Sequence, residues 1–509
     1  MTALVSALVL GTRVLQAQES KEVEQLKRQL QQMQENFDRV QREQKQQIEA
    51  LTQKLDALAK QQAAETEKKK LEQELAAELQ KNQPTPSKES PTSPVAAPST
   101  SWSPTAPIRV GSGRAYMDIG LVGTFAVGGS TAKDIEGSTQ LGGHDPNQRG
   151  FTVQGAEINF TGAVDPYFRG NANVVFQIDS SGESFVELEE AWLETMSLPA
   201  NLQVRAGQFL TDFGRLNTQH PHSWAFVDTS LVNGRFLGAD GLRNPGARLS
   251  WLAPTPFYSE LFFAVQNSQG ETAFSYREDH GGAPFLGRLN DAGRVESFDD
   301  LLFVPRYAAS FDLTDTQTLL AGVSTAFGPN GSGPDTDTQI YGVDLYWKWK
   351  SANAHGGFPF LSFQTEAMLR RYQAGAYSNA ADDSNNNGVI DSGELDVFGD
   401  GLVHAVPRET LTDWGWYGQV LYGFHKGWVA GLRGDYVAPT SLAAYETLFS
   451  PDPERLSRWR LSPNLTWYPS EFSKIRLQYN YDNRSGIGVD HSVWLQFEFL
   501  LGAHAAHKF

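Results

Sequence analysis

The clearest pattern in this chain is an alternation of apolar and polar residues near its C-terminal end. Val493, Leu495 and Phe497 fall on one face of an extended segment, and Gln496 and Glu498 fall on the other. A period of two is the repeat of a β-strand. Upstream segments repeat the pattern and place many Trp, Tyr and Phe residues on the apolar face. Strands with one aromatic, apolar face and one polar face are typical of a wall between lipid and water.

Many such segments follow one another along the chain. The segments with this alternation are 114–127, 151–163, 168–178, 185–196, 201–209, 247–252, 260–266, 305–312, 317–327, 340–349, 361–370, 413–423, 427–436, 459–467, 475–482 and 491–509. Short turns between them alternate with longer loops at 210–246, 267–304, 373–412 and 437–458. An even strand number, with short turns at one end and long loops at the other, is typical of bacterial outer-membrane barrels. We therefore predict an all-β fold, a 16-stranded antiparallel transmembrane β-barrel, over residues 109–509.

The first part of the chain shows other patterns. Residues 1–18 contain an apolar run followed by small residues, as in a signal peptide. Residues 19–81 lack Gly and Pro and place apolar residues three or four apart, which predicts an α-helical coiled coil. Residues 82–108 contain seven prolines among Ser, Thr and Ala, a composition typical of an extended linker. We expect the coiled coil to lie in the periplasm.

Charge and composition narrow the function. The net charge is −17, and residues 1–108 contain 14 basic and 14 acidic residues, so the whole excess belongs to the barrel. An acidic lumen favours cations and argues against nucleic acid as a partner. The absence of Cys excludes disulfides and Cys-ligated metal sites.

No motif of a hydrolase, a metalloprotease or a phosphate-binding loop is present, so we predict that the protein is not an enzyme. The four glutamates Glu187, Glu189, Glu190 and Glu194 share one predicted strand. Strict alternation places them on both faces of that strand, which does not favour a catalytic carboxylate pair.

Two local motifs carry a family resemblance. The run Val-Arg-Ala-Gly-Gln-Phe at 204–209 precedes Phe213-Gly214-Arg215, and the chain ends on Phe509. Residues 110–509 thereby resemble the phosphate-selective porin O/P family. Residues 213–251 are also similar to outer-membrane proteins described as zinc-regulated receptors. The porin resemblance implies a trimer, a third outer loop folded into the pore, and a terminal Phe read by the barrel-insertion machinery.

The phosphate specialisation of that family would need a ladder of lumenal arginines. A barrel that carries the whole net charge of −17 argues against such a ladder, so we expect a general porin.

The third outer loop, residues 210–246, is the expected pore constriction, because it is the loop that the resemblance folds inward. Its candidate residues are Asp212, Arg215, His220, His222, Asp228 and Arg235. Alternation within the strands predicts pore-lining residues of both signs. These are Arg205, Arg248, Arg306, Asp344, Glu366, Arg433, Asp435 and Glu498, with Arg370 and Arg476 as further inward cations. A mixed lining is typical of a diffusion pore with a transverse field. His220 and His222 would also suit a transition metal if the loop supplied a third ligand; solvated histidines are the alternative.

A twelve-residue run in the loop 373–412 matches a calcium-binding loop. Gly388 stands at the position of the sharp turn. The oxygen ligands would come from Asp383, Asn385, Asn387, the Val389 carbonyl, Asp391 and Glu394. Hard oxygen ligands without His or Cys select Ca²⁺, so we predict a structural calcium ion that orders this loop.

These observations predict a cation-leaning outer-membrane channel for passive diffusion of small hydrophilic solutes or ions. One alternative is an uptake protein for a metal ion or for an anion such as phosphate. A second alternative is a structural tether that links the outer membrane to peptidoglycan through the coiled coil. The expected partners are membrane lipid and further copies of the chain.

Overall fold

The computed structural model describes residues 108–112, 115–163, 165–391, 394, 400–448 and 452–502. The predicted signal peptide, the coiled coil, almost all of the linker and Phe509 lie outside these residues. Among the described residues, no helix combines the length and the apolar character needed to cross a membrane.

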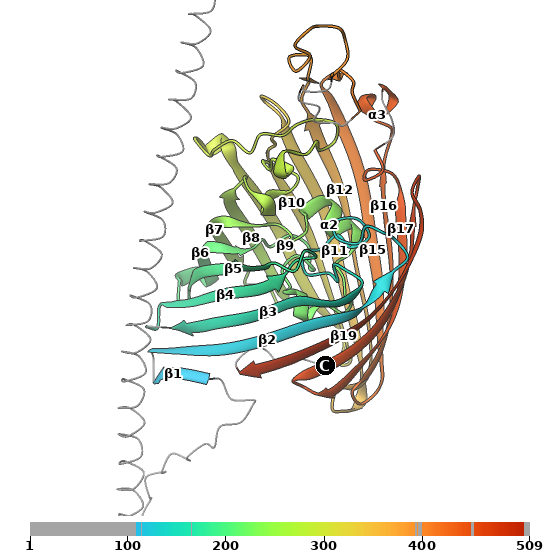
Figure 1. The fold of residues 1–509 in the computed structure, drawn as a ribbon. Coiled ribbons are helices and arrows are strands. Elements are labelled where there is room, and N and C mark those ends of the chain that lie inside the picture. The colour runs from blue at the N-terminus through green and yellow to red at the C-terminus, as the bar shows by residue number, and fades with distance from the viewer. Residues whose placement is uncertain are drawn as a thin grey trace, which may run out of the picture. The chain divides into compact units, whose positions relative to one another are not determined.

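Long antiparallel strands dominate the described part of the chain (Figure 1). They are β2 (Ala115–Ser130), β3 (Gly150–Ala163), β4 (Phe168–Ile178), β5 (Ser184–Thr195), β6 (Leu202–Leu210), β7 (Arg243–Leu252), β8 (Tyr258–Asn267), β9 (Leu301–Thr314), β10 (Gln317–Pro329), β11 (Asp337–His355), β12 (Phe358–Ala374), β15 (Glu409–His425), β16 (Trp428–Pro439), β17 (Arg458–Ser470), β18 (Ser473–Arg484) and β19 (Gly488–Gly502). The short elements are β1 (Ile108–Ser112), β13 (Tyr377–Ser378), β14 (Ala405–Val406), α2 (Leu231–Leu237), α3 (Ala444–Leu448), and the 3-10 turns η1 (Pro199–Asn201), η2 (Pro221–Ser223), η3 (Glu271–Ala273), η4 (His280–Gly282) and η5 (Phe298–Asp300).

Strand pairing closes this sheet on itself. Each long strand pairs antiparallel with its neighbours in the chain, and β19 returns to pair with β2, for example Phe497 with Phe125. Figure 1 shows β19 beside β2. The short strand β1 pairs with the first residues of β2, which β19 does not reach. The described residues therefore form a closed barrel of sixteen strands, and the predicted fold and strand count are confirmed.

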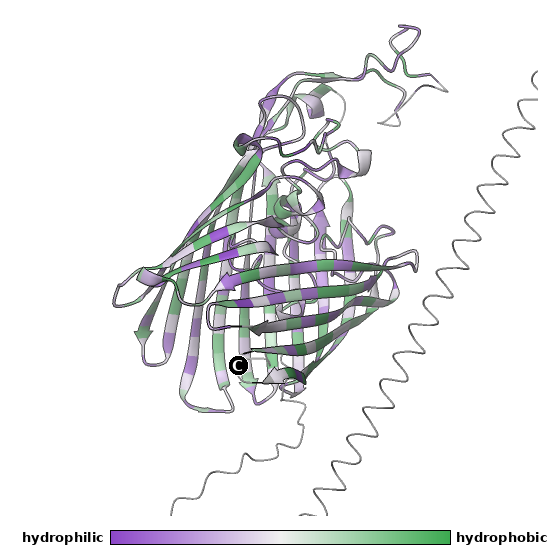
Figure 2. Cartoon of the chain, turned by 90° about the vertical axis from the view of Figure 1, so that its left-hand side faces the viewer, coloured by the Kyte–Doolittle hydropathy of each residue, from purple (hydrophilic) through white to green (hydrophobic). Residues whose placement is uncertain are grey.

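The barrel is apolar outside and polar inside. On β17 the side chains of Trp459, Leu461 and Trp467 are exposed, whereas those of Arg460 and Ser462 are buried. Figure 2 shows the same alternation as bands of opposite hydropathy along the strands. Exposed apolar side chains over so much of a surface are typical of contact with lipid. The wall thus has the side-chain distribution of a transmembrane β-barrel.

One end of the barrel carries short turns and the other carries the longer loops. We number the loops at this second end L1 (131–149), L2 (179–183), L3 (211–242), L4 (268–300), L5 (330–336), L6 (375–408), L7 (440–457) and L8 (485–487). The predicted long loops correspond to L3, L4, L6 and L7. L1, also long, was not expected.

L3 lies inside the barrel, packed on an apolar part of the inner wall. Phe213, Val232 and Phe236 of L3 share one buried cluster with wall residues such as Ile340 and Tyr417. The helix α2 lies in this loop. The Ser230 side chain accepts a hydrogen bond from the Asn233 amide at its start, and Gly238, with φ of 95°, ends it. L3 is therefore docked on the wall through its own small core.

We predict that a charge placed on the outer face destabilises the barrel in lipid. Val343 is 54% exposed, near the middle of β11. Val343→Arg should lower the free energy of unfolding from lipid vesicles by about 2–4 kcal/mol, because an arginine near the bilayer midplane loses its hydration. Denaturant titration measures this quantity, with Val343→Ile as the control, expected within about 0.5 kcal/mol of wild type. Equal stability of the arginine variant would mean that this face does not contact lipid.

Candidate functional site

A group of inward cations lines one part of the barrel wall. We call Arg433 of β16, Arg458 and Arg460 of β17, and Lys474 and Arg476 of β18 the basic wall; all five are buried. The expectation that net charge excludes a ladder of lumenal arginines was therefore wrong. Net charge sums over the whole barrel, whereas strand register gathers like charges in one place. Carboxylates partner this wall: Asp435 lies 2.8 Å from Arg433, and Glu498 lies 2.7 Å from Lys474.

Asp228 of L3 is the carboxylate that joins the loop to the basic wall. It is fully buried and accepts hydrogen bonds from Arg433 (2.7 Å), Arg460 (2.9 Å), Gln478 (2.8 Å) and Asn480 (2.9 Å). Burial alone would raise the pKa of the Asp228 carboxyl, but the charges of Arg433 and Arg460 outweigh burial and hold that pKa below its ordinary value. Asp228 therefore stays ionised at neutral pH.

The basic wall also binds the main chain of L3. The carbonyl of Asp228 accepts from Arg433 (2.8 Å), and the carbonyl of Trp224 accepts from Arg476 (3.0 Å). Lys474 donates to the carbonyl of His222. These bonds satisfy polar backbone that the barrel interior would otherwise leave unpaired. The segment from residue 222 to residue 228 is therefore fixed along the wall.

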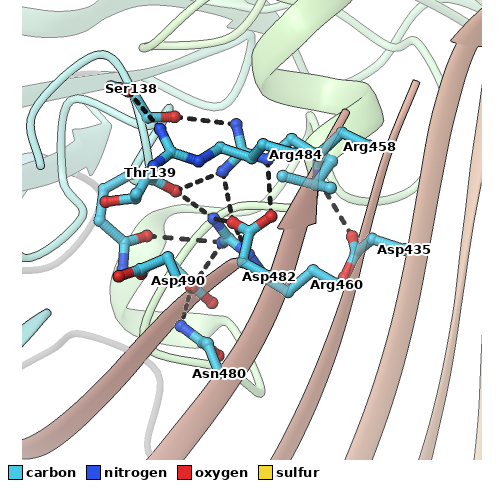
Figure 3. A network of polar contacts seen from close by, with 12 residues as sticks. Ser138, Thr139, Asp435, Arg458, Arg460, Asn480, Asp482, Arg484 and Asp490 are labelled. Carbon is cyan, nitrogen blue, oxygen red and sulfur yellow. Dashed lines mark hydrogen bonds and ion pairs between the residues drawn. The ribbon is translucent and has the colours of Figure 1, made fainter. Parts of the chain in front are cut away.

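L1 meets the basic wall beside L3 (Figure 3). Arg458 donates to the carbonyls of Ser138 and Thr139, both at 2.8 Å, and Arg460 also donates to Thr139. Asp482 of β18 lies between the two arginines and accepts from both. L1 thus enters the barrel as L3 does.

A second part of the wall is acidic. We call Glu157 of β3 together with Glu187, Glu189, Glu190 and Glu194 of β5 the acidic wall. The expectation that the β5 glutamates point to both faces was wrong. The β4–β5 register shifts so that Asn173 pairs with Glu190 and Val174 pairs with Leu188, which leaves Glu189 as a β-bulge. A bulge sends two successive side chains to one side, and Glu189 and Glu190 are both buried inside.

L3 presents its histidines to the acidic wall. His220 lies 2.8 Å from Glu189 and 3.1 Å from Glu190, and His222 lies 3.1 Å from Glu157. Burial would lower the pKa of the His220 imidazole, but the nearby charges of Glu189 and Glu157 raise it well above its ordinary value. His220 is therefore a cation at neutral pH. L3 thus matches both walls, with Asp228 on the basic one and His220 on the acidic one.

The other predicted constriction residues also belong to L3. Asp212 lies 3.2 Å from Arg248. Arg215 donates to Gln364 at 3.1 Å and lies over the Tyr346 ring. Arg235 on α2 donates to the carbonyls of residues 455 and 456.

The predicted lining residues all face the interior of the barrel. Arg306 pairs with Asp344 at 2.6 Å, and Glu366 accepts from the Leu216 amide of L3 at 2.7 Å. Arg205 and Arg248 both reach Glu194, at 2.7 and 3.0 Å. Of the further inward cations, Arg370 pairs with Asp413 at 2.9 Å. Their role in conduction stays a prediction.

Residues that the sequence reasoning missed complete the site. The sequence does not mark Arg458, Arg460 or Lys474 as lumenal cations, although Arg460 lies in the predicted strand 459–467 and Arg458 lies two residues before it. His144 of L1 and Asp240 of L3 were also missed. No local pattern marks them, because only the folding of two loops into the barrel brings them to the acidic wall.

A cavity opens among the loops. It has a volume of about 970 Å³ and lies between α2, L1, L4, L6, L7 and L8. Seven acidic and five basic side chains line it. One of the acids is Glu278 of L4, whose carboxyl pKa is raised to about 8 by burial and then by the charges of Glu271 and Asp279.

The predicted calcium ligands lie together in one turn of L6. The Asp383 carboxylate accepts from the Gly388 amide at 2.7 Å, and the side chains of Asn385 and Asn387 donate to Asp391 at 2.8 Å. Glu394 accepts from the Asp391 amide at 2.8 Å. Gly388 has a φ of 84°, in the region that glycine favours. Calcium binding itself stays a prediction.

We predict that Asp228→Asn weakens the barrel strongly. The change removes the charge that faces Arg433 and Arg460 in a buried setting, and breaking such a pair costs about 3–5 kcal/mol. Denaturant unfolding in lipid vesicles measures the loss. The matched control is Asp212→Asn, which touches a partly exposed pair and should cost about 1 kcal/mol or less. Equal losses in the two variants would contradict the anchoring role of Asp228.

No family model matches this sequence. Among solved structures, the outer membrane channel DcaP of Acinetobacter baumannii aligns with a TM-score of 0.47 at 13% identity, over 76% of this chain and 97% of that one. OmpF of Salmonella typhi, in complex with daunomycin, aligns with a TM-score of 0.45 at 10% identity, over 77% and 100%. The anion-selective porin of Comamonas acidovorans aligns with a TM-score of 0.43 at 7% identity, over 76% and 100%. TM-scores below 0.5 at such identities indicate nothing about the cargo of this chain.

A sequence relative is closer. The protein of Aquifex aeolicus (strain VF5) named "Uncharacterized protein" is 31% identical over 424 residues, which cover 77% of this chain and 80% of that protein. The chain belongs to the same family as this Aquifex aeolicus protein.

Proposed function

We propose that this protein is an outer-membrane channel for passive diffusion of small hydrophilic solutes or ions, with a preference for cations. The proposal rests on the distribution of side chains in the barrel. The outer face is apolar and the inner wall carries charged residues. L3 is held inside, between a basic and an acidic part of that wall. Such a lining gives a water-filled lumen a transverse field.

The preference for cations rests on the cavity between the loops. Its acidic side chains outnumber the basic ones by seven to five, and by six to five at pH 7, where Glu278 is mostly neutral. An entrance with an excess of negative charge concentrates cations before they reach L3. Four cations of the basic wall contribute less, because each lies within hydrogen-bond distance of a carboxylate; they are Arg433, Arg458, Arg460 and Lys474. The phosphate specialisation of the porins that the sequence resembles is therefore not part of the proposal.

We further propose that the channel is a homotrimer. The support comes from the apolar spacing in residues 19–81, which is typical of helices that associate, and from the resemblance to trimeric porins. There are two alternatives. An uptake protein for a metal ion or an anion requires a different ion selectivity, which conductance can test. A tether to peptidoglycan requires the predicted coiled coil, which lies outside the described residues.

The test is single-channel conductance of the purified protein in a planar bilayer with a salt gradient. We expect stepwise openings in groups of three and a reversal potential that indicates cation preference, because the entrance is acidic. Anion preference would instead favour a phosphate-type channel with the basic wall as its filter. Inserted, folded protein that conducts no current would contradict the channel.

The pH dependence of selectivity provides an internal control. Because the Glu278 carboxyl has a pKa of about 8, it is mostly neutral at pH 7 and mostly ionised at pH 9. The negative charge of the cavity should therefore increase as Glu278 ionises, and the preference for cations should rise from pH 7 to pH 9. Glu278→Gln should flatten that rise. An unchanged rise in the variant would assign the pH dependence to another group.

We also propose that L6 binds a structural Ca²⁺ ion through residues 383–394. The support is the match of all six ligand positions and the turn glycine to a calcium loop. Isothermal titration of Ca²⁺ should show weaker binding in Glu394→Gln, which loses the bidentate carboxylate, by about tenfold or more. The control Glu296→Gln removes a glutamate of L4 and should bind as wild type does. Equal affinity in Glu394→Gln and wild type would remove the proposal.

A further inference from the structure

His144 of L1 has an unusual environment for a histidine. Its side chain is only 7% exposed, and its Nε2 atom makes no hydrogen bond within the described residues. A buried polar atom without a partner costs free energy, so its position needs an explanation.

The contacts of Nδ1, the other ring nitrogen, show that Nε2 carries a lone pair and no proton. Nδ1 lies 3.2 Å from the carbonyl oxygen of Gln154 and 3.1 Å from the side-chain nitrogen of Gln177. The Gln177 nitrogen has two hydrogens, and it has two carbonyl acceptors, Gly143 at 2.9 Å and Gln154 at 3.0 Å. Nδ1 therefore carries the ring proton and donates it to Gln154. This is the arrangement that metal-binding histidines use to present Nε2 as a ligand.

Carboxylates surround that lone pair. The Oε1 atom of Glu189 and the Oδ1 atom of Asp240 each lie 3.9 Å from Nε2. His144, Glu187 and Asp240 each offer a ligand atom within 4.8 Å of the other two, whereas Glu189 forms such a group with Glu157 and His220. A lone pair that faces carboxylate oxygens is repelled unless a cation lies between them. An imidazolium there would draw a carboxylate to hydrogen-bond distance, and 3.9 Å exceeds that distance.

The spacing suits a metal ion. Two ligands, each about 2.0–2.2 Å from a tetrahedral Zn²⁺, lie about 3.4 Å apart, so the observed 3.9 Å closes with a small movement of each side chain. A cavity of about 30 Å³ borders His144, Glu189 and Asp240. This volume holds one or two atoms of water size.

We propose that His144, Glu187 and Asp240, with Glu189 as an additional carboxylate, bind a divalent transition metal ion inside the barrel. One imidazole among carboxylates selects an ion such as Zn²⁺, Co²⁺ or Mn²⁺, whereas Ca²⁺ and Mg²⁺ prefer oxygen ligands alone. The ion joins L1, the end of L3 and strand β5. This proposal goes beyond the proposed function and does not depend on conduction.

Two neighbouring residues position the ligands. His220 lies 2.8 Å from the other oxygen of Glu189, which orients Oε1 toward His144. Gly143 packs against Asp240, because a Cβ atom built on Gly143 would lie 2.2 Å from the Asp240 Oδ1 atom. A methyl group at residue 143 would therefore push the Asp240 carboxylate away without removing any ligand.

The experiment is isothermal titration of the full-length, detergent-folded protein with Zn²⁺ in excess Ca²⁺, which occupies sites made of oxygen alone. Wild type should bind one Zn²⁺ ion per chain at this site. His144→Gln and Gly143→Ala should each weaken binding by at least about tenfold. Titration with Co²⁺ should give a visible absorption band in wild type that His144→Gln loses.

Controls separate this site from its neighbours. His425→Gln changes an exposed histidine at the end of β15, and His222→Gln changes the histidine beside Glu157; both should bind Zn²⁺ as wild type does. Wild-type binding by His144→Gln would overturn the proposal, and so would loss of binding only in His222→Gln, which would place the ion among Glu157, Glu189 and His220. Absence of any binding by folded wild type would also overturn it. Heat-modifiable electrophoretic mobility verifies that each variant is folded, and Gly143→Ala retains every ligand.

Discussion

A buried charge inside a lipid-embedded barrel needs an oppositely charged partner beside it, and the packing of L3 depends on this constraint. Asp228 is the clearest case, since it is fully buried and receives four side chains from three adjacent strands. Without it, Arg433 and Arg460 would each keep one wall carboxylate, Asp435 and Asp482, and lose the one that holds the loop. The same arginines bind carbonyls of L1 and L3, so one ionic contact fixes the position of two loops.

L3 combines this ionic anchor with an apolar one. Phe213, Val232 and Phe236 pack on inward wall residues that are themselves apolar, such as Ile340 and Tyr417. The wall beneath the loop is therefore matched to it: apolar where α2 lies, basic where Asp228 lies and acidic where His220 lies. Because each contact uses a different part of the wall, L3 has one arrangement that satisfies them all, which is how a loop without long secondary structure keeps a defined shape in the lumen.

The acidic wall shows how a small irregularity of the backbone changes the chemistry of a barrel. Without the bulge at Glu189, one of the two successive glutamates would face lipid, where a carboxylate is costly. With it, both face His220, and Glu189 also reaches the group around His144. The proposed metal site and the attachment of L3 to β5 thus rest on the same extra residue in one strand.

The sequence by itself determined the architecture. Alternation of apolar and polar residues predicted all sixteen strands and the inward direction of Arg306, Asp344, Glu366 and Asp435, because a strand's period of two holds wherever one face meets lipid. It did not determine the orientation of Glu189, since a bulge breaks the period, and it did not reveal the basic wall, since net charge does not show which charges become neighbours. The proximity of His144 and Asp240 was decided by tertiary structure alone. They are 96 positions apart in the chain and meet only because two loops fold into the lumen and are held there by charge.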